Sequence, residues 1–157
     1  MCSSDLSRRL SAELADGAAP NPGAPIMFEP HLDTVMGHEY CCEVLDVGPG
    51  VNNLKSGDII VSFPVTFDDQ GIHGVGFSNK YPGGYSERIV ANEMMSIKVP
   101  NGLSPELAAM TEPLAVGVHA VEKSRIASGD AALILGLGPV GLACIAELKM
   151  RGIGPII

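Results

Sequence analysis

Residues 131–142 read AALILGLGPVGL, a short apolar run followed by three glycines spaced as G-x-G-x-x-G. This order predicts a strand, a tight turn and the start of a helix. Gly136 suits the sharp turn because glycine adopts backbone angles closed to other residues, and Gly141 lets the helix lie close to its strand. Gly138 leaves room for a pyrophosphate beside the main chain, facing the N–H groups of the helix start. Pro139 fits the first helical turn.

An isolated G-x-G-x-x-G is a weak signal, because an ordinary glycine turn has the same pattern. The apolar run before it and the helix-like stretch after it favour binding of NAD or NADP. The motif begins within the last 22 residues, and the acidic residue that helps to select the cofactor is expected ~20 residues further on. The sequence therefore does not choose between NAD and NADP. The residues expected to bind the cofactor are Gly136, Gly138, Pro139, Val140 and Gly141.

Composition limits the partners of the chain. A hydrophobic content of 46% with 18% charged residues is typical of a globular protein, and 157 residues allow one domain plus part of another. A net charge of −8 argues against nucleic acid as the main partner, because a phosphate backbone requires a basic surface. No 18-residue apolar run is present and the first ten residues lack the apolar core of a signal peptide. We expect no membrane partner and a cytoplasmic location.

The four cysteines, at positions 2, 41, 42 and 144, include no C-x-x-C pair. Their spacing does not predict a disulfide framework or a closed structural zinc site. We expect reduced thiols, with Cys41, Cys42 and Cys144 as small core residues.

Alternating and β-branched residues separated by glycine-rich turns predict a β-rich segment, followed by two helices and a parallel α/β unit. Residues 66–84 are expected to form a long loop. His31 and His73 both lie in predicted loops and are expected to be solvated. In the second helix, apolar residues at 114, 118 and 121 predict one packed face, with His119 packed beside it. The predicted strands are 40–47, 59–63, 85–90 and 94–99, and the predicted helices are 104–109 and 114–123.

A thiol, an imidazole and a carboxylate that could bind zinc precede the glycine turn. Thiolate, imidazole and carboxylate are the ligands of catalytic zinc sites, and Cys2, His38 and Glu112 supply one of each. Each also has an ordinary interpretation. Cys2 could be a terminal residue, His38 a polar side chain at a strand end, and Glu112 an acid that complements a helix dipole.

Seven motifs in order resemble those of the zinc-dependent medium-chain dehydrogenases, in the branch of sorbitol, threonine and glucose dehydrogenases. They are CSSDL at 2–6, GHE at 37–39, VGPGV at 47–51, GD at 57–58, GGYSE at 83–87, EPLAVGVHA at 112–120 and GLGPVG at 136–141. The resemblance implies an α/β plus all-β fold, with a GroES-like β-barrel catalytic domain at residues 1–112. Residues 113–157 would then form the first βα unit of a Rossmann domain, and the chain would be truncated at both ends.

The resemblance also implies metal ligands. Cys2 and His38 match the two invariable ligands of the catalytic zinc. Glu39 matches an acid that binds the zinc directly or supports a ligand, and Glu112 matches the acid that reaches the metal or its water.

The same resemblance implies a route for the proton. Ser4 matches the hydroxyl that hydrogen-bonds the alcohol and accepts its proton, while zinc lowers the pKa of the alcohol and hydride passes to the nicotinamide. Asp5 matches the carboxylate that orients the histidine. Ser7 stands where many relatives have a relay histidine, which leaves the relay route open.

The family's four-cysteine lobe has no counterpart in residues 59–90, so one catalytic zinc and no structural zinc are expected. The function implied is oxidoreduction of a secondary alcohol or polyol with NAD(P) by a homodimer or homotetramer, with a small-molecule alcohol or carbonyl as substrate. A zinc-independent NADPH-dependent ketone or quinone reductase and a non-catalytic nucleotide-binding protein are the alternatives. The 157-residue chain itself is expected to be inactive.

Overall fold

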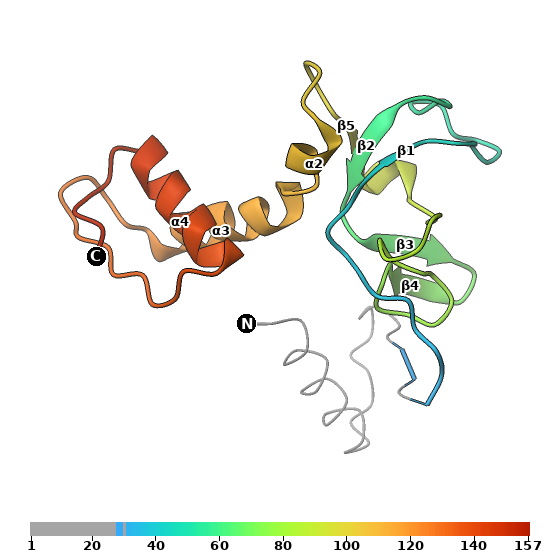
Figure 1. The fold of residues 1–157 in the computed structure, drawn as a ribbon, viewed down its shortest axis with the longest axis horizontal. Helices are drawn as coiled ribbons and strands as arrows, with labels where there is room; N and C mark the ends of the chain where they lie inside the picture. The colour runs from blue at the N-terminus through green and yellow to red at the C-terminus, as the bar shows by residue number, and fades with distance from the viewer. Residues whose placement is uncertain (1–27, 30) are drawn as a thin grey trace. The chain divides into compact units, whose positions relative to one another are not determined.

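The computed structural model describes residues 28–29 and 31–157 (Figure 1). The chain divides into two compact units. The first contains the described residues up to Gly37 together with Pro64–Asn92, and the second contains His38–Phe63 and Glu93–Ile157. Cys2, Ser4, Asp5 and Ser7, which the sequence places at or near a zinc site, lie outside the described residues.

A three-stranded antiparallel sheet forms the β part of the second unit. Its strands are β1 (Cys41–Glu43), β2 (Ile59–Ser62) and β5 (Ser96–Lys98), in the order β1-β2-β5. Ile60 lies opposite both Cys42 and Lys98 and is 2% exposed, so the sheet is anchored at its centre. The short 3₁₀ helix η1 (Glu93–Met95) leads directly into β5.

The strand predicted at 59–63 is confirmed, whereas those at 40–47 and 94–99 are shorter than predicted. β1 stops at Glu43 because the ladder becomes irregular there. The Val44 N–H donates to the Asp58 carbonyl at 2.8 Å, but the Val44 carbonyl accepts from the Gly57 N–H, at 2.9 Å, and not from that of Asp58.

The described part of the first unit contains the hairpin of β3 (Val65–Asp68) and β4 (Gly71–Gly74), paired from Val65 opposite Gly74 to Asp68 opposite Gly71. The prediction of a loop over 66–84 is therefore wrong for its first part, where glycine masked the strand signal. The prediction of a strand over 85–90 is also wrong. There the Ser86 N–H donates to the Gly83 carbonyl at 3.0 Å and closes a turn. The Ser86 Oγ lies 2.7 Å from the carbonyl oxygens of both Gly83 and Arg88 and donates its one hydrogen to either of them.

Both predicted helices are present, as α2 (Pro105–Ala108) and α3 (Thr111–Ser124). The Ser104 hydroxyl accepts from the Leu107 N–H at 3.5 Å, and Pro105 occupies the first turn of α2. α3 ends where Arg125 adopts the left-handed conformation, with φ of 57°. No helix in the described part of the chain is both long enough and apolar enough to cross a membrane.

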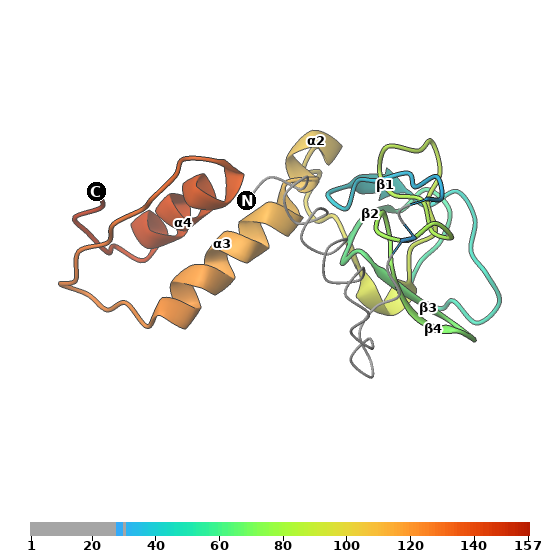
Figure 2. The ribbon, with the colours of Figure 1, turned by 90° about the horizontal axis from the view of Figure 1, so that it is seen from below.

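The helix after the glycine turn, α4 (Pro139–Met150), packs against α3 (Figures 1 and 2). Gly117 permits this contact, since a Cβ there would lie 2.4 Å from the Cβ of Ala143. The nearby Cys144 thiol donates to the Gly117 carbonyl at 3.6 Å. A core forms beside this contact from Val121, Ala132, Leu148 and Ile153, with Cys144 among the residues packed on it.

Of the three positions of α3 predicted to pack, 121 is confirmed, whereas 114 and 118 are wrong. Pro113, Gly117 and Val121 are buried, whereas Leu114, Val118 and His119 are exposed. The prediction that His119 packs is wrong. The buried residues of α3, Pro113, Gly117 and Val121, follow one another at intervals of four and form one face, and Gly117 on this face contacts α4.

The predicted strand before the glycine turn forms a parallel bridge between Ala132 and Ile156. The Ala132 N–H donates to the Pro155 carbonyl, and the Ile134 N–H to the Ile157 carbonyl, each at 2.9 Å. The sequence predicts the segment before the glycine turn and the helix after it; the second parallel segment, which returns after α4 to residues 155–157, was not predicted.

Candidate metal site and glycine turn

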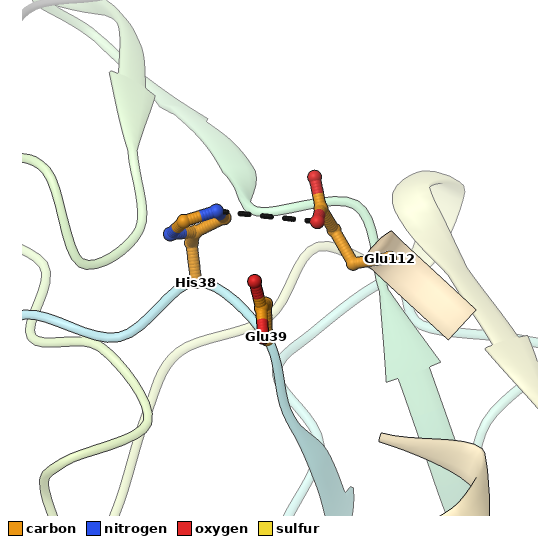
Figure 3. A group of neighbouring side chains, drawn as sticks. All are labelled: His38, Glu39 and Glu112. Carbon is orange, nitrogen blue, oxygen red and sulfur yellow. Dashed lines mark ion pairs between the residues drawn. The ribbon is translucent and has the colours of Figure 1, made fainter. Parts of the chain in front are cut away.

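Three side chains of the second unit bring possible metal-binding atoms together. His38, Glu39 and Glu112 each offer one such atom, and these atoms lie within 4.8 Å of one another (Figure 3). The Nε2 atom of His38 lies 4.0 Å from Oε2 of Glu112. One imidazole and two carboxylates are a donor set that zinc accepts.

His38 and Glu39 are neighbours in sequence, yet both point toward Glu112 (Figure 3). Successive side chains of a regular strand would point to opposite faces. Both residues precede β1, so this alternation does not apply to them. Tyr40, which follows, is 8% exposed and anchors the segment in the unit. Burial raises the pKa of Tyr40 to about 12.

Glu112 lies in the first turn of α3 and is partly buried, with its side chain 24% exposed. Burial raises the pKa of Glu112 above its ordinary value; the charge of Glu39 adds to this effect, and His38 opposes it. A cation between these groups would relieve both the desolvation and the repulsion of the two acids. Glu112 is thus a helix-start acid and also faces His38.

The glycine turn has the backbone that the sequence predicts. Gly136 has φ of 103°, and a Cβ on Gly141 would lie 2.1 Å from the Gly136 carbonyl oxygen. A Cβ on Gly138 would meet nothing within 4 Å, so the space beside it is open. Gly138 caps α4 without a side-chain hydrogen bond, and Pro139 follows in the first turn. The N–H groups of the helix start therefore face outward without a side-chain cap.

One polar cluster was missed by sequence reasoning. His73, predicted to be solvated, is 2% exposed, and its Nε2 lies 2.8 Å from Oδ1 of Asp68. The prediction is wrong because β4 places His73 inside the hairpin unit, where its Nε2 pairs with Asp68; its buried Nδ1 atom has no hydrogen-bond partner among the described residues. The other loop histidine, His31, is solvated as expected, with its side chain 74% exposed. The one sequence signal that could distinguish the two histidines is the alternation of inward and outward side chains along β4. Glycines at both ends of this strand make the alternation hard to recognise.

The cysteines differ in part from prediction. Cys41, Cys42 and Cys144 are free thiols, and all three are only partly buried. Cys144 packs on the α3–α4 core as predicted. Burial raises the pKa of both Cys41 and Cys42, which keeps the two thiols protonated at neutral pH.

Comparison with known proteins indicates the class of protein that carries such a candidate metal site and glycine turn. Residues 1–101 match the family model of the alcohol dehydrogenase GroES-like domain. The (R,R)-butanediol dehydrogenase of Bacillus subtilis (strain 168) is 37% identical over 97% of this chain and 45% of its own length. A sorbitol dehydrogenase of the same organism is 33% identical, covering 78% of this chain and 38% of its own.

Solved structures agree. The crystal structure of 2R,3R-butanediol dehydrogenase from Bacillus subtilis matches with a TM-score of 0.69 at 34% identity, over 85% of this chain and 44% of that one. A putative zinc-binding dehydrogenase from Sinorhizobium meliloti 1021, bound to NADP, matches with a TM-score of 0.70 at 25% identity, over 83% and 41%. The fold is that of a GroES-like domain and an adjoining α/β unit of a dehydrogenase.

The chain belongs to the zinc-type medium-chain alcohol dehydrogenase family, whose members depend on zinc and NAD(P). It spans about half the length, or less, of the curated relatives it matches.

Proposed function

We propose that this chain carries the metal site and the cofactor turn of a zinc-dependent oxidoreductase that moves hydride between a secondary alcohol or polyol and NAD(P). The observation that supports this most directly is the convergence of His38, Glu39 and Glu112. The names of the relatives, butanediol and sorbitol dehydrogenases, indicate the substrate class.

In the proposed site, Cys2, His38 and Glu112 hold one zinc ion, and Glu39 binds it or supports a ligand. A bound zinc would supply Lewis-acid chemistry toward the oxygen of the alcohol. Ser4 is proposed to hydrogen-bond that oxygen and take its proton, and Asp5 to orient the histidine ring.

The cofactor half of the proposal rests on the glycine turn. Gly136 and Gly141 set the turn, and the open space at Gly138 with the uncapped start of α4 suits a pyrophosphate. Pro139 and Val140 belong to the same first turn. We propose residues 1–112 as the catalytic domain and 113–157 as part of the dinucleotide-binding domain, in an enzyme that is a homodimer or homotetramer.

Titration of the chain with Co²⁺ under reducing conditions tests the metal site, because cobalt replaces zinc and reports its ligands by absorption. We expect one equivalent to bind with the spectrum of a tetrahedral site that includes a thiolate. The variants His38→Asn and Glu112→Gln should each weaken binding by at least about 100-fold, the upper range for loss of a supporting group alone.

Matched controls separate a ligand effect from a general one. His31→Asn changes an exposed histidine, and Glu122→Gln changes an exposed acid on the same helix as Glu112. Both should bind cobalt as the wild type does. Equal binding by His38→Asn and the wild type would exclude the proposed site. Dinucleotide binding without metal binding would instead favour the nucleotide-binding or zinc-independent alternatives.

A further inference from the structure

Asp68, the last residue of β3, accepts hydrogen bonds from three side chains of the first unit. Lys80 Nζ lies 2.6 Å from Oδ2, the Tyr81 hydroxyl 2.9 Å from the same oxygen, and His73 Nε2 2.8 Å from Oδ1. His73 therefore donates a hydrogen from Nε2, because an ionised carboxylate only accepts. One carboxylate thus joins β4 to residues 80 and 81.

The same carboxylate also closes the hairpin. The backbone N–H groups of Gln70 and Gly71 donate to Oδ1 at 2.8 and 3.2 Å. Asp68 therefore accepts from five donors. Two are backbone N–H groups at the hairpin turn, one is a side chain of β4, and two are the side chains of residues 80 and 81.

The cluster runs from the interior of the unit to its surface, since the Lys80 side chain is 49% exposed whereas His73 is buried. The side chains of His73 and Asp68 are 3% and 14% exposed, and the rings of His73 and Tyr81 lie 5.0 Å apart at 59°. A carboxylate withdrawn from water is stable as an ion only when donors surround it, and here they do.

The charges around Asp68 agree with this arrangement. The Lys80 ammonium, followed by His73, the Gln70 N–H and the Tyr81 hydroxyl, holds the pKa of Asp68 well below its usual range, against the opposing effect of burial. The pKa of Lys80 is raised in turn, chiefly by its bond to Asp68. The remaining ionisable neighbour, Asp69, is exposed.

The segment that follows the cluster is paired with the residues before the metal site. The N–H groups of Gly83, Gly84 and Tyr85 donate to the carbonyls of Val35, Gly37 and Met36 at 2.8, 2.8 and 3.1 Å. Residues 80 and 81 directly precede this pairing. Because both bond Asp68, we expect that carboxylate also to stabilise the pairing of residues 83–85 with residues 35–37.

We propose that Asp68 is a metal-independent clasp that closes residues 65–85 of the first unit. A structural zinc joins several side chains of a loop at one centre; here a carboxylate does so, and residues 59–90 contain no cysteine. The Lys80 ammonium balances its charge. The clasp is separate from the candidate zinc site and does not depend on metal binding at His38.

Hydrogen exchange of the whole chain tests the clasp. In Asp68→Asn, the amides of Gly83, Gly84 and Tyr85 should exchange at least about tenfold faster than in the wild type, because the charged acceptor shared by five donors is lost. Asp69→Asn removes the same charge from the adjacent exposed residue and should leave these rates unchanged. Addition of EDTA to the wild type should also leave them unchanged.

Two further variants cover the case in which Asp68→Asn does not fold. Tyr81→Phe and Lys80→Met each remove one donor, and each should speed the exchange of the same amides by about three- to tenfold. The clasp is refuted if Asp68→Asn behaves as Asp69→Asn does, or if both single-donor variants match the wild type. It is equally refuted if EDTA alone removes the protection, since a metal ion would then hold the segment.

Discussion

Replacement of Gly117 by alanine tests how closely α3 and α4 must pack. The added Cβ would lie 2.4 Å from the Cβ of Ala143, and 2.9 Å from both the Ala143 carbonyl carbon and the Cys144 nitrogen. Non-bonded carbon atoms prefer about 3.5 Å or more, so the helices would have to separate by about 1 Å here. Overpacking of this kind costs about 1–3 kcal/mol.

Helix propensity opposes this cost, because alanine is about 1 kcal/mol more favourable than glycine inside a helix. Two of the three nearest atoms belong to the backbone and cannot rotate away. We therefore expect a net loss of about 1 kcal/mol in the free energy of unfolding. Urea unfolding followed by far-ultraviolet circular dichroism measures this loss through the helices themselves.

A second substitution isolates the contact. Ala143→Gly in the Gly117→Ala background removes the nearest atom and should recover about 1 kcal/mol as a coupling energy. Ala146→Gly is the control, because Ala146 is an exposed residue of α4 that is not among the atoms nearest Gly117. It lowers the helix propensity of α4 without relieving the contact, so it should show no coupling energy with Gly117→Ala. Stabilisation of the chain by Gly117→Ala alone would refute the close packing of the two helices.

Three other predictions concern the turn, the metal and the clasp. Gly141→Ala should cost about 1–3 kcal/mol in urea unfolding, because its Cβ would lie 2.1 Å from the Gly136 carbonyl oxygen. Gly138→Ala, with nothing within 4 Å of its Cβ, should be tolerated. Zinc should raise the thermal unfolding midpoint of the wild type but not that of His38→Asn, and equal shifts would contradict the site. Because the pKa of Asp68 is lowered in the folded chain, its contribution to stability is complete above a pH of about 4 and is lost as the pH falls toward the folded pKa. Asp68→Asn should therefore flatten the acid side of a plot of urea midpoint against pH, and an unchanged slope would contradict the assignment.

Elements with local signals were predictable from sequence. Ser104 and Pro105 mark the start of α2 by hydrogen bonding and by a fixed φ, and both effects act within one turn. The glycine turn is similar, since Gly136 and Gly141 are required by contacts within six residues. The family resemblance, which the comparisons confirm, depends on several such local motifs in the right order.

Features fixed by distant contacts were not predictable from single residues. His73 has the same loop-like sequence context as His31, and only pairing with β3 places it on Asp68. Residues 85–90 have strand-like letters, but the Ser86 N–H closes a turn instead.

The candidate metal site was predictable in its residue types but not in its geometry. The residue types at His38 and Glu112 suggested zinc, but their separation in sequence gave no distance. Their convergence depends on where α3 begins relative to the segment before β1.

α3 also links the two proposed half-sites. Glu112 lies in its first turn, and Gly117, about 7.5 Å further along the helix axis, fixes the contact with Ala143 of α4. The helix thus acts as a rigid spacer between the acid at the metal site and the helix that begins at the glycine turn. Under the proposed function, loops around such a spacer can change in sequence and length without changing the distance along α3 between Glu112 and the contact with α4.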